Sequence, residues 1–235
     1  MIEGLPVVFP LLISVSAVFC AVMLVLAARR AGASGTAVAA LAAVSGLILA
    51  VQVYLGISGY YLEMNSPAPR LITAAPPAIL ILVLFVLAAM PRGNSPLRTL
   101  TLLHTVRVPV ELVLWGLFLH GQVPQLMTFE GINPDIISGL TAPFAAWMGF
   151  KEGRPRRAIL IVWNLVTLAL LVNIVWHAVL SVPTPLQRYG FDRPNVGVLY
   201  FPFIWLPAYI VPAVFAAHVW SLRELIFPRA SEGSI

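Results

Sequence analysis

Long apolar runs separated by short polar breaks form the dominant pattern of this chain. A transmembrane helix needs about 20 mostly apolar residues, because it rises about 1.5 Å per residue and must cross roughly 30 Å of hydrocarbon. Seven segments meet or approach this requirement: residues 5–28, 36–62, 71–90, 99–122, 136–150, 158–181 and 201–227. The pattern predicts an all-α integral membrane protein, with a single transmembrane domain over residues 1–235 built as a seven-transmembrane-helix bundle.

The fifth segment, residues 136–150, is shorter than the others and would also suit a re-entrant structure. The charges of the loops favour a full span. With seven spans, one set of loops collects most of the basic residues, namely Arg29, Arg30, Arg92, Arg98, Lys151, Arg154, Arg156, Arg157, Arg223 and Arg229. The opposite set has only Arg70, Arg188 and Arg193. Because positively charged loops stay in the cytoplasm, we expect the N-terminus outside and the C-terminus in the cytoplasm.

Composition agrees with a membrane protein and removes other classes. Hydrophobic residues make up 60% of the chain and charged residues 10%, whereas a soluble domain has about 25% charged residues. A soluble globular protein, a disordered chain and a nucleic-acid module are therefore excluded. The net charge of +5 resides in short loops, so it indicates topology rather than a nucleic-acid partner. The expected partners are the lipid bilayer and other membrane subunits.

The fourth segment contains the most informative polar residues. His104, Arg107 and Glu111 share one helical face, and Trp115 continues the stripe. Arg107 and Glu111 are four residues apart, which predicts an ion pair within the helix. A charge near the midplane costs about 2.5–3.5 kcal/mol on insertion scales, so we expect this face to point into the bundle. The stripe is either a functional polar site or a structural pair that fixes helix register.

Two polar residues in other segments extend this candidate ligand site. They are Asn164 in the sixth segment and Tyr209 in the seventh. Pro207 and Pro212 lie within the seventh segment, where proline removes helix hydrogen bonds and kinks the helix, and Pro76 does the same in the third. Kinked helices open space inside a bundle, which favours an internal site.

The four histidines raise the possibility of a haem or a metal. His104 and His218 are expected near the inner side, and His120 and His177 near the outer side. A di-haem arrangement is disfavoured because His104 and His120 lie about 160° apart around one helix. A single haem or metal at His104 and His218 remains an alternative. A retinal Schiff base is excluded, because the one lysine, Lys151, lies in a loop.

Two long outer loops carry opposite charges. Residues 121–135 contain Glu130 and Asp135, and residues 182–200 contain Arg188 and Arg193. Loops longer than about 12–15 residues are often lids or binding surfaces. We therefore expect the loops to pack as a cap, with an acidic residue of one close to a basic residue of the other.

Three stretches carry a resemblance to other proteins. They are MTFEGINPDIISGLTAP, WNLVTLALLVNIVWHAVLSVPTP and YFPFIWLPAYIVP. These stretches resemble an uncharacterised family of small bacterial multi-pass proteins over about residues 99–227. The resemblance implies a multi-pass protein of the cell inner membrane, and the family has no established activity from which site residues could be assigned.

Three functions fit these observations. The first is a small-ligand or ion site inside the bundle, used for transport or sensing. The second is an assembly subunit of a larger membrane complex. The third is a haem- or metal-dependent membrane enzyme, so the sequence leaves open whether the chain is an enzyme.

Overall fold

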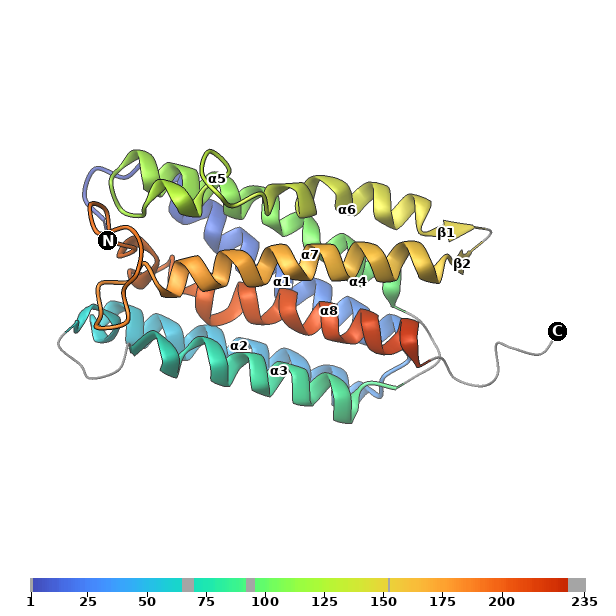
Figure 1. Cartoon of the computed structure of the whole chain (residues 1–235). Helices are drawn as coiled ribbons and strands as arrows, with labels where there is room; N and C mark the ends of the chain where they lie inside the picture. Colours follow the sequence, from blue (N-terminus) through green and yellow to red (C-terminus); the bar gives the residue numbers. More distant parts are fainter. Residues whose placement is uncertain (1, 65–69, 92–95, 152, 228–235) are drawn as a thin grey trace.

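The computed structural model describes residues 2–64, 70–91, 96–151 and 153–227, which form a bundle of roughly parallel and antiparallel helices (Figure 1). The α-helices are α1 (Val8–Arg30), α2 (Gly35–Ile57), α3 (Ala75–Ala89), α4 (Leu97–Leu103), α5 (Arg107–Leu119), α6 (Ile136–Met148), α7 (Arg157–Val179) and α8 (Val211–Ile226). The shorter elements are the 3₁₀ turns η1 (Tyr60–Leu62), η2 (Arg70–Thr73), η3 (His104–Val106), η4 (Gln125–Met127) and η5 (Gly197–Leu199), the π-helix η6 (Leu206–Ile210), and a hairpin of β1 (Phe150–Lys151) and β2 (Arg154–Pro155). Arg92 and Arg229, used above for topology, lie outside the described residues.

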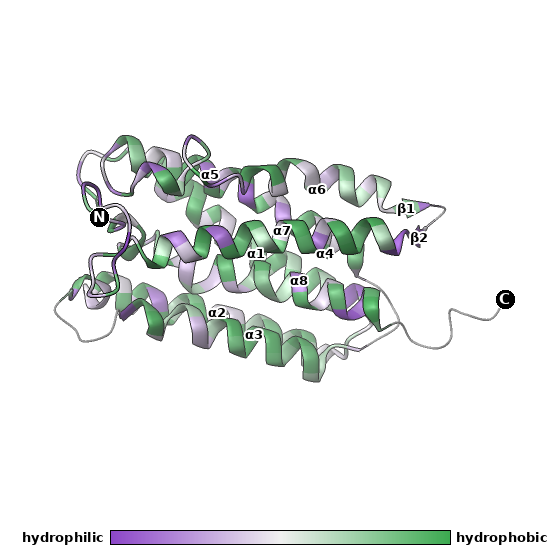
Figure 2. Ribbon diagram, viewed as in Figure 1, coloured by the Kyte–Doolittle hydropathy of each residue, from purple (hydrophilic) through white to green (hydrophobic). Residues whose placement is uncertain are grey.

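Six helical stretches of the described chain are long and apolar enough to cross a membrane. They are Val8–Arg30, Gly35–Ile57, Arg70–Ala89, Leu97–Leu119, Arg157–Val179 and Leu206–Ile226. Hydrophobic residues line most of their length (Figure 2). Large apolar side chains such as Leu80, Phe144 and Trp147 are exposed on the outside of the bundle. So wide an apolar surface is unfavourable in water and suits contact with lipid.

The fifth predicted span, residues 136–150, is shorter than these six stretches and begins inside the bundle. Helix α6 has 13 residues, which corresponds to a length of about 20 Å. The preceding segment, residues 121–135, returns along the bundle without forming a long helix, and its Met127, Thr128 and Asn133 are buried. Irregular backbone is tolerated at membrane depth when it is packed against protein and hydrogen-bonded. Here the amide nitrogens of Thr128 and Gly131 donate to the carbonyls of Gln125 and Thr128.

Two prolines interrupt regular helix where the candidate site is built. Pro109 has no amide hydrogen to donate to the carbonyl of Thr105, and the tighter turn η3 precedes it between α4 and α5. Pro212 likewise leaves the carbonyl of Ala208 without its helical donor, and the π-helix η6 ends just before it. Pro76 was expected to kink the third span. It instead occupies the first turn of α3, where proline is well accommodated.

Helix α8 is the most deeply enclosed element and organises the packing. It contacts α3, α7 and α4, and its Trp220 is fully buried. Arg223, counted above as a loop residue, is a buried residue of α8. Its guanidinium donates to the carbonyl of Val86 at 2.8 Å and pairs with Glu224 at 2.7 Å. Arg223 therefore ties α8 to the last turn of α3, which is a structural role.

Close packing of α6 against α5 depends on Gly139. A Cβ atom at this position would lie 2.8 Å from the backbone nitrogen of Val108 and 3.3 Å from Cβ of Arg107. Because backbone cannot move aside like a flexible side chain, any larger residue would push α6 away from the candidate site described below.

We predict that Gly139→Ala lowers the free energy of unfolding by about 1–3 kcal/mol, the usual cost of overpacking a well-packed contact. The matched control is Gly46→Ala in α2, where an added Cβ would meet no atom within 4 Å. The control should be neutral or stabilise the helix by up to about 1 kcal/mol. Unfolding of the purified variants in detergent measures both effects. A Gly139→Ala variant as stable as the parent would contradict the packing argument.

Candidate functional site

A buried arginine lies at the centre of a polar cluster between α5, α6, α7 and α8. Arg107 is the first residue of α5 and is 2% exposed. One terminal nitrogen of its guanidinium donates to Oδ1 of Asp135 at 2.7 Å and to the carbonyl of Thr167 at 2.8 Å. The other contacts Nε2 of His218 at 2.9 Å. One side chain thus joins α5 to α7, to α8 and to the start of α6.

The contact with Arg107 fixes the hydrogen-bonding state of His218. A guanidinium can only donate, so Nε2 of His218 accepts and the ring proton lies on Nδ1. That Nδ1 is 3.0 Å from Oδ1 of Asn164, which can only accept. The amide nitrogen of Asn164 in turn donates to the carbonyl of Leu160 at 2.8 Å. Both ring nitrogens of His218 are therefore occupied within the protein.

The second branch of the cluster contains Glu111, one turn beyond Arg107 on α5. Its Oε1 accepts a hydrogen bond of 2.6 Å from the side-chain amide of Asn133. The same amide nitrogen also donates to the carbonyl of Met127 at 3.0 Å, and the amide oxygen accepts from the backbone of Asp135. Asp135 additionally accepts from the hydroxyl of Ser138 at 3.1 Å. Asn133 thus bonds to the side chain of Glu111 and to the backbone of Asp135.

Charge and hydrogen bonding are not balanced within this cluster. One guanidinium, from Arg107, faces the two carboxyl side chains of Glu111 and Asp135. Among the described residues, Oε2 of Glu111, Nε of Arg107 and both ring nitrogens of His104 have no hydrogen-bond partner although all four atoms are buried. Unsatisfied buried polar atoms are costly, and each one in a native structure calls for an explanation.

A cavity of about 270 Å³ adjoins the cluster. It lies between α3, α5, α7 and the η6–α8 segment, and apolar side chains such as Pro76, Leu114 and Val214 form most of its wall. The polar residues that line it are Arg107, Glu111, Asp135 and Asn195. Ligand sites typically combine an apolar wall with a few polar groups, in a volume of about 300–1,000 Å³. The cavity falls close to the lower end of that range.

The structure gathers some of the predicted ligand-site residues and separates others. His104, Arg107, Glu111 and Asn164 all lie in or beside the cluster and are buried. Trp115 lies further out, where its indole nitrogen donates to Glu130 at 2.9 Å. The role of the predicted ligand-site residues in ligand binding remains a prediction.

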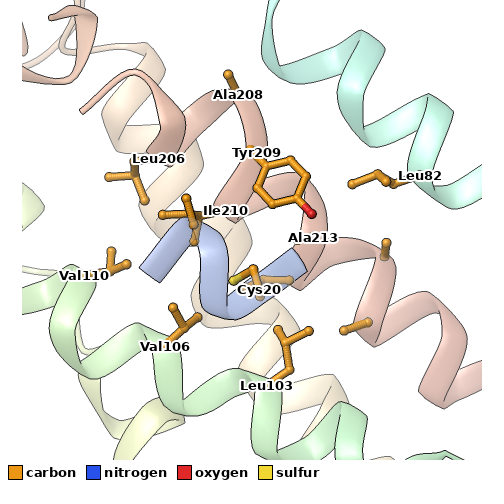
Figure 3. Packing of buried hydrophobic residues seen from close by; sticks show 14 of the residues in the cluster. Cys20, Leu82, Leu103, Val106, Val110, Leu206, Ala208, Tyr209, Ile210 and Ala213 are labelled. Atoms are coloured by element: carbon orange, nitrogen blue, oxygen red, sulfur yellow. The ribbon is translucent and has the colours of Figure 1, made fainter. Parts of the chain in front are cut away.

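Tyr209 belongs to a different part of the core. It packs in the apolar cluster that also contains Cys20 of α1 and Leu82 of α3 (Figure 3). Its neighbours Pro207 and Ile210 line the cavity, whereas Tyr209 does not. The π-helix therefore turns the Tyr209 side chain away from the polar cluster, which the sequence could not show.

Two predicted ion pairings are wrong. Arg107 pairs with Asp135 rather than with Glu111, because the segment before α6 delivers Asp135 and Asn133 to this depth of the bundle. For the same reason Asp135 is unavailable to the outer loop residues Arg188 and Arg193. Arg188 instead donates to the carbonyl of Gln187 at 3.3 Å.

The outer loops nevertheless contact each other. Both loops pack on α5, where the guanidinium of Arg193 lies 5.6 Å from the ring centroid of Phe118 and Glu130 accepts a hydrogen bond from Trp115. The backbone amides of Val196 and Gly197 both donate to the carbonyl of Gln122, at 3.1 and 2.8 Å. The loops therefore meet through backbone hydrogen bonds rather than through the expected acidic and basic pairs.

The two expected histidine pairs, His104 with His218 and His120 with His177, differ in the contacts that they make. The rings of His104 and His218 have centroids 4.2 Å apart. A metal between two imidazoles needs about 2 Å to each nitrogen, so ring centroids this close leave no room for a porphyrin plane between them. His120 and His177 each bond through Nδ1 to a carbonyl of their own helix, those of Gly116 and Asn173. No group of three or more metal-binding side chains occurs among the described residues.

Sequence reasoning assigned Asp135 to an outer loop and His218 only to a weak metal site, and it missed Asn133 and Thr167. One feature of the sequence could have identified Asp135 as a buried site residue. A segment of about 15 residues cannot cross the whole bilayer, so one of its ends had to lie inside the bundle. Asp135, directly before that segment, is the residue that must then be buried and paired.

We predict a strong coupling between Arg107 and Asp135. Arg107→Met and Asp135→Asn should each destabilise the protein by about 3–5 kcal/mol, because each leaves one buried charge without its partner. The double variant should lose less than the sum of the two single variants. Equilibrium unfolding in detergent measures the cycle. Glu130→Gln, which alters an exposed hydrogen bond, is the control and should change stability by at most about 0.5 kcal/mol. Additive single effects would show that the two residues do not depend on each other.

Comparison with known proteins gives a family and no further relatives. No curated protein matches the chain. No solved structure matches it either. The family described as "Domain of unknown function (DUF8737)" matches residues 81–226, which is more than half of the chain and includes every member of the polar cluster. The chain therefore belongs to this family of unknown function.

Proposed function

We propose that the bundle binds a small, membrane-soluble ligand in the cavity beside Arg107, Glu111 and Asp135, and that this binding serves transport or sensing. The observation that carries the proposal is the combination of an apolar cavity of about 270 Å³ with charged side chains on its wall. Interior space that has no role is normally filled by side chains, because protein interiors are close-packed. A site for a polar ion would not need a mostly apolar wall.

The polar end of the ligand is expected at the cluster and its apolar body in the remainder of the cavity. Arg107, Glu111, Asp135 and Asn195 are the polar residues of the cavity wall. A ligand that binds the folded protein and not the unfolded chain stabilises the folded state, so binding should also raise the unfolding temperature.

We predict that Val214→Phe reduces ligand occupancy by about tenfold or more, because overpacking costs about 1–3 kcal/mol and 1.4 kcal/mol is tenfold in affinity. Val214 is buried and lines the cavity. The measurement is native mass spectrometry of protein purified in mild detergent, followed by solvent extraction of the bound molecule. The control is Val166→Phe on the lipid-facing surface of α7, where the parent side chain is 54% exposed. A parent protein without a bound species, or equal occupancy in both variants, would contradict the proposal.

We further propose that the chain resides in the bacterial inner membrane with seven membrane-crossing segments, its N-terminus outside and its C-terminus in the cytoplasm. The support is the asymmetry of basic residues between the two sets of loops. The β1–β2 hairpin, with Lys151 and Arg154, lies at the end of the bundle opposite the N-terminus (Figure 1). Helix α6 then crosses the inner half of the bilayer and residues 121–135 the outer half.

We predict opposite accessibility for cysteines introduced at the two ends of the bundle. In a Cys20→Ala background, Phe191→Cys should react with a membrane-impermeant sulfonated maleimide in intact spheroplasts, and Arg154→Cys should react only after lysis. Both parent side chains are exposed, whereas Asn195 is fully buried and unsuitable for labelling. Reaction of Arg154→Cys from outside would overturn the proposed topology.

A further inference from the structure

An apolar groove lies on the lipid-facing side of the bundle, along the C-terminal part of α7. Its wall on this helix extends from Leu171 to Leu180, and Ile79 of α3 and Phe215 of α8 line its other sides. The hollow has a volume of about 270 Å³, and none of its described lining residues is charged. Two residues of the wall, Val172 and Trp176, are 54% and 59% exposed, so the groove is open to the surroundings of the bundle.

The length of the groove matches one leaflet of a bilayer. The nine helical steps from Leu171 to Leu180 correspond to about 14 Å along α7. The hydrocarbon of one leaflet is about 15 Å deep, half of the roughly 30 Å of the whole core. Trp176 lies towards the end of the groove where α7 finishes, and tryptophan is typical of the boundary between hydrocarbon and headgroups. The groove therefore has the extent of a single acyl chain.

An arginine is held at this end of the groove. The carbonyl of Leu180, the last groove residue of α7, accepts hydrogen bonds from the backbone amides of Arg188 at 2.7 Å and Tyr189 at 3.1 Å. The ring centroid of Tyr189 lies 5.0 Å from that of His177 on α7. These contacts fasten the loop to the end of α7, on the side of the bundle where the N-terminus lies (Figure 1).

The guanidinium of Arg188 is available to an anion. The residue is exposed, and within the described chain its side chain forms no ion pair, either with Asp192 of the same loop or with another carboxylate. Its side-chain hydrogen bond, to the carbonyl of Gln187, is long at 3.3 Å. A guanidinium presents its donors in a planar fork that matches the oxygens of a phosphate.

We propose that the groove binds a phospholipid, with one acyl chain along Leu171 to Leu180 and the phosphate against Arg188. A free phosphate would leave the apolar groove unused, and a hydrocarbon would leave the cation unused. A phospholipid uses both, with its headgroup at the interface and its chain at the depth where it already lies in the bilayer. This site is separate from the proposed function, because Val172, Trp176, Leu180 and Phe215 line the groove and not the cavity.

The test uses the full chain purified in dodecyl maltoside, titrated with a phosphatidylcholine that carries a photoreactive diazirine in one acyl chain. Carbene insertion is mapped by mass spectrometry at Trp176 and Phe215, relative to Leu140 and Phe144 on the lipid-facing side of α6. Insertion into the groove should saturate with probe concentration, whereas insertion into α6 should rise linearly. Groove labelling that rises linearly as well would overturn the proposal.

Competition and one variant test the phosphate. A diacylglycerol with the same chains should compete about tenfold more weakly than unlabelled phosphatidylcholine, because it cannot bond to a charged group in the same way. Arg188→Gln should weaken probe binding about tenfold and abolish this preference. The control is Arg154→Gln, an exposed arginine at the opposite end of the bundle, which should behave like the parent. A preference that survives in Arg188→Gln would overturn the placement of the phosphate.

Variants on α7 test the position of the acyl chain. Val172→Trp adds bulk at the groove and should lower saturable labelling of Phe215 about tenfold. Val162→Trp, on the same helix but 62% exposed and outside the groove, is its control. If Val172→Trp fails to fold, Trp176→Ala removes part of the wall and should have the same effect, with the 71% exposed Trp147→Ala of α6 as control. Equal labelling of variant and control would overturn the position of the chain.

A second copy of the chain is the competing occupant of the groove. A dimer seen by light scattering in detergent that dissociates in Trp176→Ala but persists in Trp147→Ala would assign the groove to that copy and overturn the lipid.

The remaining outcomes separate the phospholipid site from the proposed function. Val214→Phe narrows the cavity but does not touch the groove, so labelling of Trp176 should be unchanged. A co-purified molecule that is lost in Val214→Phe belongs to the cavity, whereas a phospholipid that is lost in Arg188→Gln belongs to the groove. Saturable groove labelling without any molecule in the cavity refutes the proposed function alone, and a cavity ligand without saturable groove labelling refutes the phospholipid site alone.

Discussion

The neutralisation of one guanidinium inside an apolar bundle is the constraint on which the rest of the site depends. Arg107 is enclosed at mid-depth, where an unpaired charge would cost several kcal/mol. Its partners come from three other segments: Asp135 before α6, Thr167 of α7 and His218 of α8. Because each bond requires its partner to be present, the packing of these helices around α5 and the charge state of the cluster are determined together.

The same requirement explains the unusual course of the chain before α6. Asp135 can reach Arg107 only if residues 121–135 turn back into the bundle, so α6 starts at mid-depth and remains short. The polar backbone of this segment is then satisfied by its own turns and by Asn133, which bonds to Glu111 and to the carbonyl of Met127. Gly139 allows α6 to approach α5 closely enough for these contacts to form.

The cavity adjoins the hydrogen-bonded network around Arg107. Arg107, Glu111 and Asp135 are hydrogen-bonded within the network and also line the apolar cavity. The π-helix η6 contributes Leu206, Pro207 and Ile210 to the cavity wall and directs Tyr209 into the apolar core instead. An apolar space with a few charged residues on its wall is the combination that ligand sites typically have.

The sequence by itself determined the largely helical architecture, the positions of the long apolar helices and the burial of His104, Arg107 and Glu111. These features follow from local hydropathy, helical periodicity and the cost of exposing charge to lipid, all of which act within one segment. Only the tertiary structure decided that Arg107 pairs with Asp135, that His218 and Asn164 join the cluster, and that Tyr209 lies apart from it. Such choices depend on which distant segments pack side by side, and residue spacing within a single helix carries no information about them.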